Sequence, residues 1–354
     1  MKNLKPHTKR DLATYLGLAI AWIAVEAMRS GGMLGRSTSG LLVPICCYVV
    51  MALSLNLTVG IMGELSLGHA GFMGIGAFTG IIASQSLMYA LPSVPLRLIV
   101  AMVCGAIFAG IFGFLIGIPV LRLRGDYLAI VTLAFGEIIK ELITCLLVGA
   151  DEHGLHIIFN YKGLRNVEDL HLSPAGQVII KGAQGATGTQ PIANFTAGML
   201  LIFVTLFIIL NLIHSRTGRA IMAIRDNRIA AESVGLNVTQ HKMIAFVMSA
   251  AMAGAAGALY GLNYSNLVAS KFDFNTSILV LVFVVLGGLG NMAGSIIAAV
   301  LLYVLPEELR GLGEYRMLIY AVVLITVMLV TNSPATQGLI ARFRYSGKGG
   351  AQHE

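Results

Sequence analysis

The sequence predicts an all-α membrane protein, a polytopic transmembrane bundle of about 8–10 helices. Of its 354 residues, 56% are hydrophobic and 12% are charged, whereas soluble proteins carry about a quarter charged residues. The mean hydropathy is +0.82, and the apolar residues gather in runs of about 20, the length of helix that spans a bilayer. This composition argues against a soluble enzyme, a disordered regulator and a secreted disulfide scaffold.

Apolar runs define the expected spans in order along the chain. A first, weaker run covers residues 12–28, after a basic N-terminus. It contains Glu26 and is followed by no convincing cleavage site, so it is interpreted as an uncleaved helix rather than a signal peptide. The clearer spans are residues 41–59, 65–89, 96–118, 127–149, 192–213, 243–262, 278–305 and 316–331.

Basic residues predict the orientation of these spans, because short basic loops resist translocation. If the spans alternate, the N-terminus (residues 1–11), the turn with Arg122 and Arg124, and the loop 214–242 all lie on one side. That side is therefore predicted to be the cytoplasm, in a multi-pass membrane protein. Residues 150–191 then form an external loop.

The transmembrane domain, residues 12–331, is expected to cross the membrane an even number of times. Nine crossings would place the basic tail, residues 332–354, outside, against the charge rule, so we predict that this tail is cytoplasmic. A helix that is broken within the membrane would make the number of crossings even. Glycine-rich stretches at 287–291 or around 60–76 are the two candidate sites for the break, since such breaks are tolerated when buried in protein.

Glycines spaced four residues apart predict close packing of the helices, because small residues let helix backbones approach one another. This interpretation is preferred over a glycine-lined substrate site. The pairs are Gly76 and Gly80, Gly113 and Gly117, Gly257 and Gly261, and Gly290 and Gly294.

The sequence contains no motif for catalysis or cofactor binding. A GxxxxGK[ST] phosphate loop, a GxSxG elbow, an HExxH motif and a CxxC pair are all missing from it. We therefore expect no cofactor in this chain, and any ATP and Mg to be bound by partners. His153, His156 and His171 match no standard metal spacing and are assigned to a solvated loop. The net charge of +7 reflects topology rather than nucleic-acid binding.

The loop 214–242 is longer than a simple turn requires. Apolar residues alternate there with Arg219, Arg225 and other charged residues, which predicts short amphipathic helices broken by Gly235. Such helices lie on lipid headgroups or enter a protein groove. Periodicity alone favours the lipid surface.

This loop resembles the ATPase-docking loop of permease subunits of bacterial ABC importers. The matching residues are Ala230, Ala231 and Gly235, with Ile229 where the family usually has glutamate. The stretch LNLTVGIMGELSLGHAGFMGIGAF (residues 55–78) is similar to the signature of LivM-type branched-chain amino acid permeases. Three further blocks follow in the family's order: GDYLAIVTLAFGEII (125–139), IAFVMSAAMAGAAGALY (244–260) and GGLGNMAGSII (287–297).

The resemblance implies a transport subunit without catalytic residues of its own, located in a bacterial inner membrane. It also implies a second related permease, two cytoplasmic ATPases and an external substrate-binding protein as partners, in addition to membrane lipid. The helices of the loop 214–242 would then be cytoplasmic coupling helices. Arg219, Arg225, Ala230, Ala231 and Gly235 are the candidate ATPase-coupling residues.

Three other functions remain open at this point. Urea or short-chain amide permeases are related, but their signature tends to carry bulkier residues after the histidine than residues 70–76 do here. A secondary transporter could use Glu137 and Lys140 as a proton relay. A purely structural membrane subunit is the third alternative.

Ionisable residues within the spans are candidates either for the translocation path or for structural bonds. Glu137 and Lys140, with Glu141 beside them, are expected near the middle of one span, and we interpret them as an ion pair inside the bundle. His69 is interpreted as a hydrogen-bonded packing residue. Glu64 is a further candidate, at a position where the family commonly has glutamine.

Overall fold

The computed structural model describes residues 6–32, 35–88, 91–123, 125–151, 154–160, 167–170, 176–313 and 315–332. The chain divides into two compact units, Met1–Ala299 and Val300–Glu354, and each is considered by itself. The tail predicted to be cytoplasmic lies outside the described residues from residue 333 onward, as do Arg124, His153 and His171.

Helices dominate the described part of the chain, which confirms the predicted fold class. The first unit holds α1 (Pro6–Ser30), α2 (Arg36–Asn56), α3 (His69–Ser86), α4 (Val94–Val120), α5 (Asp126–Thr144), α6 (Phe195–His214), α7 (Arg216–Asp226), α8 (Arg228–Ser233), α9 (Val238–Gly261) and α10 (Phe274–Gly287). Helix α11 (Met292–Glu308) runs from the first unit into the second, which also holds α12 (Tyr315–Asn332).

Five helices among the described residues are long and apolar enough to cross a membrane by length and composition. They are Asp11–Ser30, Thr38–Met62, Val94–Val120, Phe195–His214 and Val238–Gly261. The predicted runs 65–89 and 278–305 begin late or are interrupted, and the run 127–149 ends early. None of these three runs, nor the run 316–331, is among the five helices.

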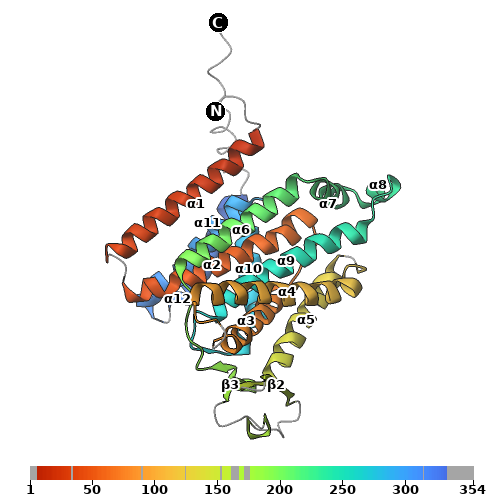
Figure 1. Ribbon diagram of the computed structural model, residues 1–354. Coiled ribbons are helices and arrows are strands. Elements are labelled where there is room, and N and C mark those ends of the chain that lie inside the picture. Colours follow the sequence, from red (N-terminus) through yellow and green to blue (C-terminus); the bar gives the residue numbers. More distant parts are fainter. Residues whose placement is uncertain are drawn as a thin grey trace. The chain divides into compact units, whose positions relative to one another are not determined.

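Helices α3, α4 and α9 lie side by side in the centre of the first unit (Figure 1). Glycines allow this packing. A Cβ atom added to Gly76 on α3 would lie 2.0 Å from the carbonyl oxygen of Gly254 on α9, and one added to Gly257 would lie 1.9 Å from that of Met73. Real Cβ atoms do not approach other atoms so closely, so the predicted role of Gly76 and Gly257 in packing is confirmed.

Both glycine-rich stretches offered by the sequence interrupt a helix. After α2 the chain forms a π-helix, Leu57–Met62, and then an irregular segment that ends where α3 begins at His69. Gly63 ends the π-helix with a φ of 78°, a conformation that glycine adopts readily. The second break, at residues 288–291, separates α10 from α11.

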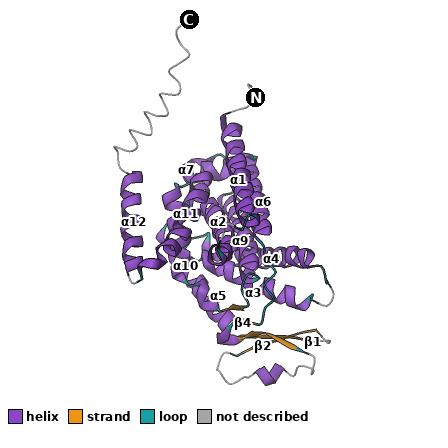
Figure 2. Ribbon diagram, turned by 90° about the vertical axis from the view of Figure 1, so that its left-hand side faces the viewer, coloured by secondary structure: helices purple, strands orange, loops and turns teal. Residues whose placement is uncertain are grey.

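A five-stranded antiparallel sheet adds to the helical fold and was not predicted. Its order is β2-β1-β3-β4-β5, and its strands lie beyond the end of α5 (Figure 2). The predicted span 127–149 is wrong at its end, because α5 stops at Thr144 and β1 begins at Leu146. The strands are β1 (Leu146–Asp151), β2 (Gly154–Phe159), β3 (Gln177–Lys181), β4 (Ala186–Thr187) and β5 (Asn266–Leu267).

Candidate functional site

The loop 214–242 contains two short helices, α7 and α8, as predicted, but the break between them lies at Asn227 and not at Gly235. Ser215 caps α7 by accepting a hydrogen bond from the N–H of Gly218 (3.1 Å), and Asn227 caps α8 by accepting one from the N–H of Ala230 (3.0 Å). Such caps are favourable because they satisfy N–H groups that a helix leaves free at its start. Gly235 follows α8 with a φ of 84°, in the left-handed conformation that commonly ends a helix.

The apolar residues of this segment face two ways. Ala231 is 4% exposed and packs with Ile224, Val238 and Leu236, so it supports the segment from inside. Ile229 and Val234 are 81% and 76% exposed. These two side chains, and not Ala231, form the outer apolar surface of the segment.

Arg219 and Arg225 both donate to backbone carbonyl groups. The Nη1 atom of Arg219 lies 2.8 Å from the carbonyl oxygen of His214, at the end of α6. The Nη1 atom of Arg225 lies 2.8 Å from the carbonyl oxygen of Gly60, in the π-helix. In an α-helix this oxygen would accept from the N–H of Glu64, but that N–H bonds to the carbonyl oxygen of Thr58 instead (3.1 Å). The π-helix thereby makes the Gly60 oxygen available to Arg225.

Glu64 forms an ion pair with Lys242, in the second turn of α9. Both side chains are largely buried. A buried charge needs a partner, because an unpaired charge is strongly destabilising in a low dielectric. The structure therefore gives Glu64 a structural bond within the protein.

The two helix breaks contact one another. Asn56, fully buried at the end of α2, accepts a hydrogen bond from the N–H of Gly290 and donates one to Oγ of Ser295, each 2.8 Å long. The backbones are so close that a Cβ atom on Gly60 would lie 2.2 Å from the Gly290 nitrogen. The π-helix and the break between α10 and α11 thus form one connected site.

His69 begins α3 and is buried. Its Nε2 atom lies 2.7 Å from Oγ of Ser54, which agrees with its interpretation as a hydrogen-bonded packing residue. Ser249 continues the contact on the other side, because its hydroxyl donates to the carbonyl oxygen of Ser54 and lies 2.9 Å from Oγ1 of Thr58. Hydrogen bonds thus join α2, α3, α9 and the π-helix.

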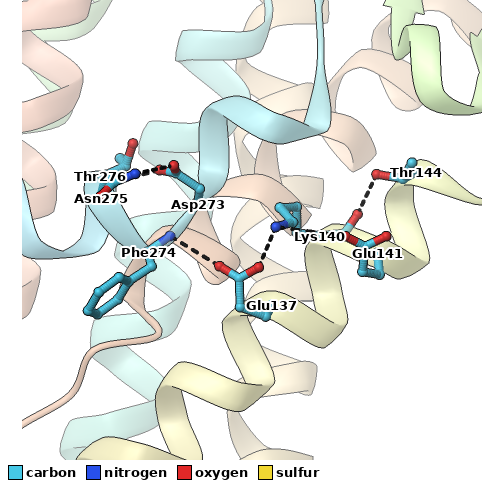
Figure 3. A network of polar contacts seen from close by, with 8 residues as sticks. All are labelled: Glu137, Lys140, Glu141, Thr144, Asp273, Phe274, Asn275 and Thr276. Carbon is cyan, nitrogen blue, oxygen red and sulfur yellow. Dashed lines mark hydrogen bonds and ion pairs between the residues drawn. The ribbon is translucent and has the colours of Figure 1, made fainter.

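Glu137 and Lys140 form the predicted ion pair (Figure 3). Their predicted place near the middle of a span is wrong, because α5 ends at Thr144 and both residues lie in its last turns. The side chains of Lys140 and Glu137 are 22% and 36% exposed, so the pair is only partly buried.

The same carboxylate also reaches α10. Glu137 accepts a hydrogen bond from the N–H of Phe274 (3.2 Å), the first residue of α10. Asp273 caps that helix by accepting from the N–H of Thr276 (3.0 Å) (Figure 3). Two carboxylates thus accept from two of the four free N–H groups at the start of α10, and Glu137 ties α5 to it.

A family model described as branched-chain amino acid transport system / permease component matches residues 37–330. The chain belongs to this permease family. The match runs from the start of α2 into α12 and therefore includes both helix breaks, the segment α7–α8 and the sheet. It also contains the four sequence blocks, between residues 55 and 297, that carry the resemblance.

Relatives in this permease family are similar along most of the chain. The sequence is 35% identical over 327 residues to the high-affinity branched-chain amino acid transport system permease protein LivM of Salmonella typhimurium, a match that covers 91% of this chain and 73% of the relative. Identity to LivM of Escherichia coli is 34% with the same coverage. The LivH permease protein of Salmonella typhimurium is 25% identical over 80% of this chain and 89% of its own length. No solved structure matches.

Sequence reasoning missed Lys242, which lies at the end of the loop 214–242. Its partner Glu64 lies 178 positions away in the sequence, so no local pattern shows what the lysine contacts. A lysine just before an apolar helix, together with a glutamate in a glycine-rich break, was the only available signal.

Lys140→Met is expected to lower the free energy of unfolding by only about 1 kcal/mol. The Glu137 side chain is partly exposed and still accepts the hydrogen bond from the N–H of Phe274. Glu137→Leu removes both the ion pair and the bond to α10, and we expect a loss of about 2 kcal/mol. Unfolding of the purified protein in detergent, followed by circular dichroism, measures both values.

The double variant separates structure from transport. Glu137→Leu with Lys140→Met should be more stable than Glu137→Leu alone, since the single variant leaves the partly buried lysine with only the exposed Glu141, 3.7 Å away. A double variant that keeps wild-type stability but loses all transport would instead put the pair in the translocation path.

Proposed function

We propose that this chain is a permease subunit that imports branched-chain amino acids across the bacterial inner membrane, driven by ATP hydrolysis in partner subunits. The observation that carries the proposal is the similarity to LivM over 91% of the chain, together with a family match that includes the coupling segment. Both favour amino acid import over a urea permease and over a secondary transporter.

The proposed assembly contains a second related permease, two cytoplasmic ATPases and an external substrate-binding protein. ATP and Mg would be bound by the ATPases, and this chain would supply the path and the mechanical coupling. Relatives named LivM and LivH in the same organism support a pair of different permeases. Alternating access then requires that the ATPases bind the segment α7–α8 differently in their open and closed states.

The outer apolar surface of Ile229 and Val234 is the proposed ATPase contact. Ile229 and Val234 are the two most exposed large apolar side chains among the described residues, and a short helix that enters a protein groove presents such anchors. Ala231 packs with Ile224, Val238 and Leu236, and Gly235 follows the helix with a positive φ, so both fix the shape of the segment. Arg219 and Arg225 hold the segment on α6 and on the π-helix.

Reconstitution of the complete assembly in liposomes tests this function. We expect labelled leucine to accumulate only when ATP is supplied on the ATPase side and the binding protein on the other. A protonophore should leave that uptake unchanged. Uptake of urea without leucine, or uptake that needs a proton gradient rather than ATP, would contradict the proposal.

A further inference from the structure

Two cations on the proposed coupling side reach the interrupted helix before α3. Arg225 lies at the end of α7, and Lys242 lies in the second turn of α9. Helix α8, with the proposed docking surface, lies between them in the sequence. The two cations bond to the same short stretch of chain, at Gly60 and at Glu64.

Arg225 holds this stretch by its backbone. Its guanidinium donates to the Gly60 carbonyl oxygen (2.8 Å), and its position is fixed by Asp226, whose Oδ1 atom lies 2.9 Å from Nη2. The aliphatic part of the side chain covers Gly63, where an added Cβ atom would lie 2.5 Å from Cγ of Arg225. Hydrogen bonds from a charged donor are stronger than neutral ones, so this contact can transmit force.

Lys242 holds the same stretch from a different element. It belongs to α9, the helix whose glycines pack against α3 and α4 in the centre of the first unit. Its ion pair with Glu64 therefore fixes that side chain to the part of the bundle that is packed most closely. Gly60 is attached to α7, whereas Glu64 is attached to α9.

The stretch between Gly60 and Glu64 has an irregular backbone that can change its conformation. It contains the end of the π-helix, whose wider turn often marks a functional site, and Gly63 with its φ of 78°. Beside it lies a cavity of about 520 Å³ lined by Ile61, Arg225 and the second break, from Leu289 to Ala293. Asn56 joins that break to the π-helix. A displacement of Gly60 would therefore be passed on to Gly290, and the cavity leaves room for it.

We propose that Arg225 and Lys242 are positioning residues for ATP-driven transport. Arg225 pulls on the broken helix through the Gly60 carbonyl group, while Lys242 holds the same helix in place through Glu64. Movement of α7 relative to α9 then bends the chain between these points and shifts both helix breaks together. The inference rests on the proposed function, because it assigns the contacts that carry movement from the ATPases into the membrane.

The test measures amino acid transported per ATP hydrolysed by the complete assembly in liposomes. Arg225→Ala is expected to lower this ratio about tenfold, the size of effect expected for the loss of one charge-assisted hydrogen bond, while ATP hydrolysis continues. Arg225→Lys keeps a donor and a flexible aliphatic chain, so it should recover part of the ratio. Lys271→Gln removes a cation that contacts neither break and should leave the ratio unchanged.

Charge exchange tests the anchor. Glu64→Lys and Lys242→Glu should each uncouple transport, because like charges then face each other. The double exchange, Glu64→Lys with Lys242→Glu, restores an ion pair and should restore the ratio. If the single variants fail to assemble, the transport ratios of the double exchange and of the Arg225 variants still test the proposal.

Wild-type coupling in Arg225→Ala, or uncoupling that the double exchange leaves unrepaired in an intact assembly, would overturn the proposal. So would an equal loss of hydrolysis and uptake, since the contacts would then act on the ATPases and not on transmission. Leucine uptake by the wild-type assembly is measured first. Its absence would reject the proposed function separately from these contacts.

Discussion

Gly257→Ala is expected to prevent the protein from folding stably in the membrane. The added Cβ atom would lie 1.9 Å from the Met73 carbonyl oxygen and 3.0 Å from the Ala77 nitrogen. Both atoms belong to the backbone of α3, so relief requires the helices to move apart. Overpacking of this kind is expected to lower the free energy of unfolding by about 3 kcal/mol or more.

The matched control is the same substitution in a looser part of the bundle. At Gly110 on α4, an added Cβ atom would meet the Ala251 Cβ atom at 3.5 Å, an ordinary contact. Gly110→Ala should therefore change stability by less than about 1 kcal/mol. The yield of monodisperse protein in size-exclusion chromatography and the thermal midpoint measure both variants. Equal midpoints for the two would show that the helices are not packed as described.

Ile229→Lys with Val234→Lys is expected to abolish amino acid uptake by releasing the ATPases. These side chains are 81% and 76% exposed, so their replacement leaves the fold of the permease within about 0.5 kcal/mol of the wild type. A docking surface depends on a few anchors, and replacing two apolar ones by ammonium groups, at one position where the family usually has glutamate, should weaken the contact at least about a hundredfold. Co-purification of the ATPases and uptake of leucine should fall together.

Two further variants make this result specific. Ile229→Leu keeps the apolar surface and should retain the ATPases. Gly235→Val meets no neighbouring atom, but its φ of 84° disfavours a β-branched residue, so it should distort the end of α8 and weaken binding. Full retention of the ATPases in the double Lys variant would remove the docking assignment and favour a segment that lies on lipid headgroups.

The long helices could be predicted because a bilayer requires continuous apolar runs. The predicted spans 96–118 and 192–213 agree closely with α4 and α6. The positions of the helix breaks could be predicted, since glycine clusters mark them. The sequence did not reveal that the chain breaks at both positions, because that depends on the hydrogen bond between Asn56 and Gly290.

The sheet was missed because β1 continues the apolar run of α5 with no glycine or proline at the boundary. Hydropathy alone does not separate a short buried strand from the end of a helix. The orientation of Ala231 was also beyond prediction, since α8 has 6 residues and so short a helix defines no clear apolar face. The contacts of Arg225 and Lys242 join residues 165 and 178 positions apart, where no spacing rule applies.

The small sheet can be completed only late in the synthesis of the protein. Strand β4 pairs with β5 through Ala186 and Leu267, and α6 to α9 lie between them in the chain. A nascent chain that has not yet reached Asn266 therefore has β4 without that neighbour, and an unpaired strand edge invites pairing with other chains. Because non-local strands pair late, the sheet is completed only after α9 has been made. Pairing of β5 with β4 therefore takes place only in chains whose central helices have already been synthesised.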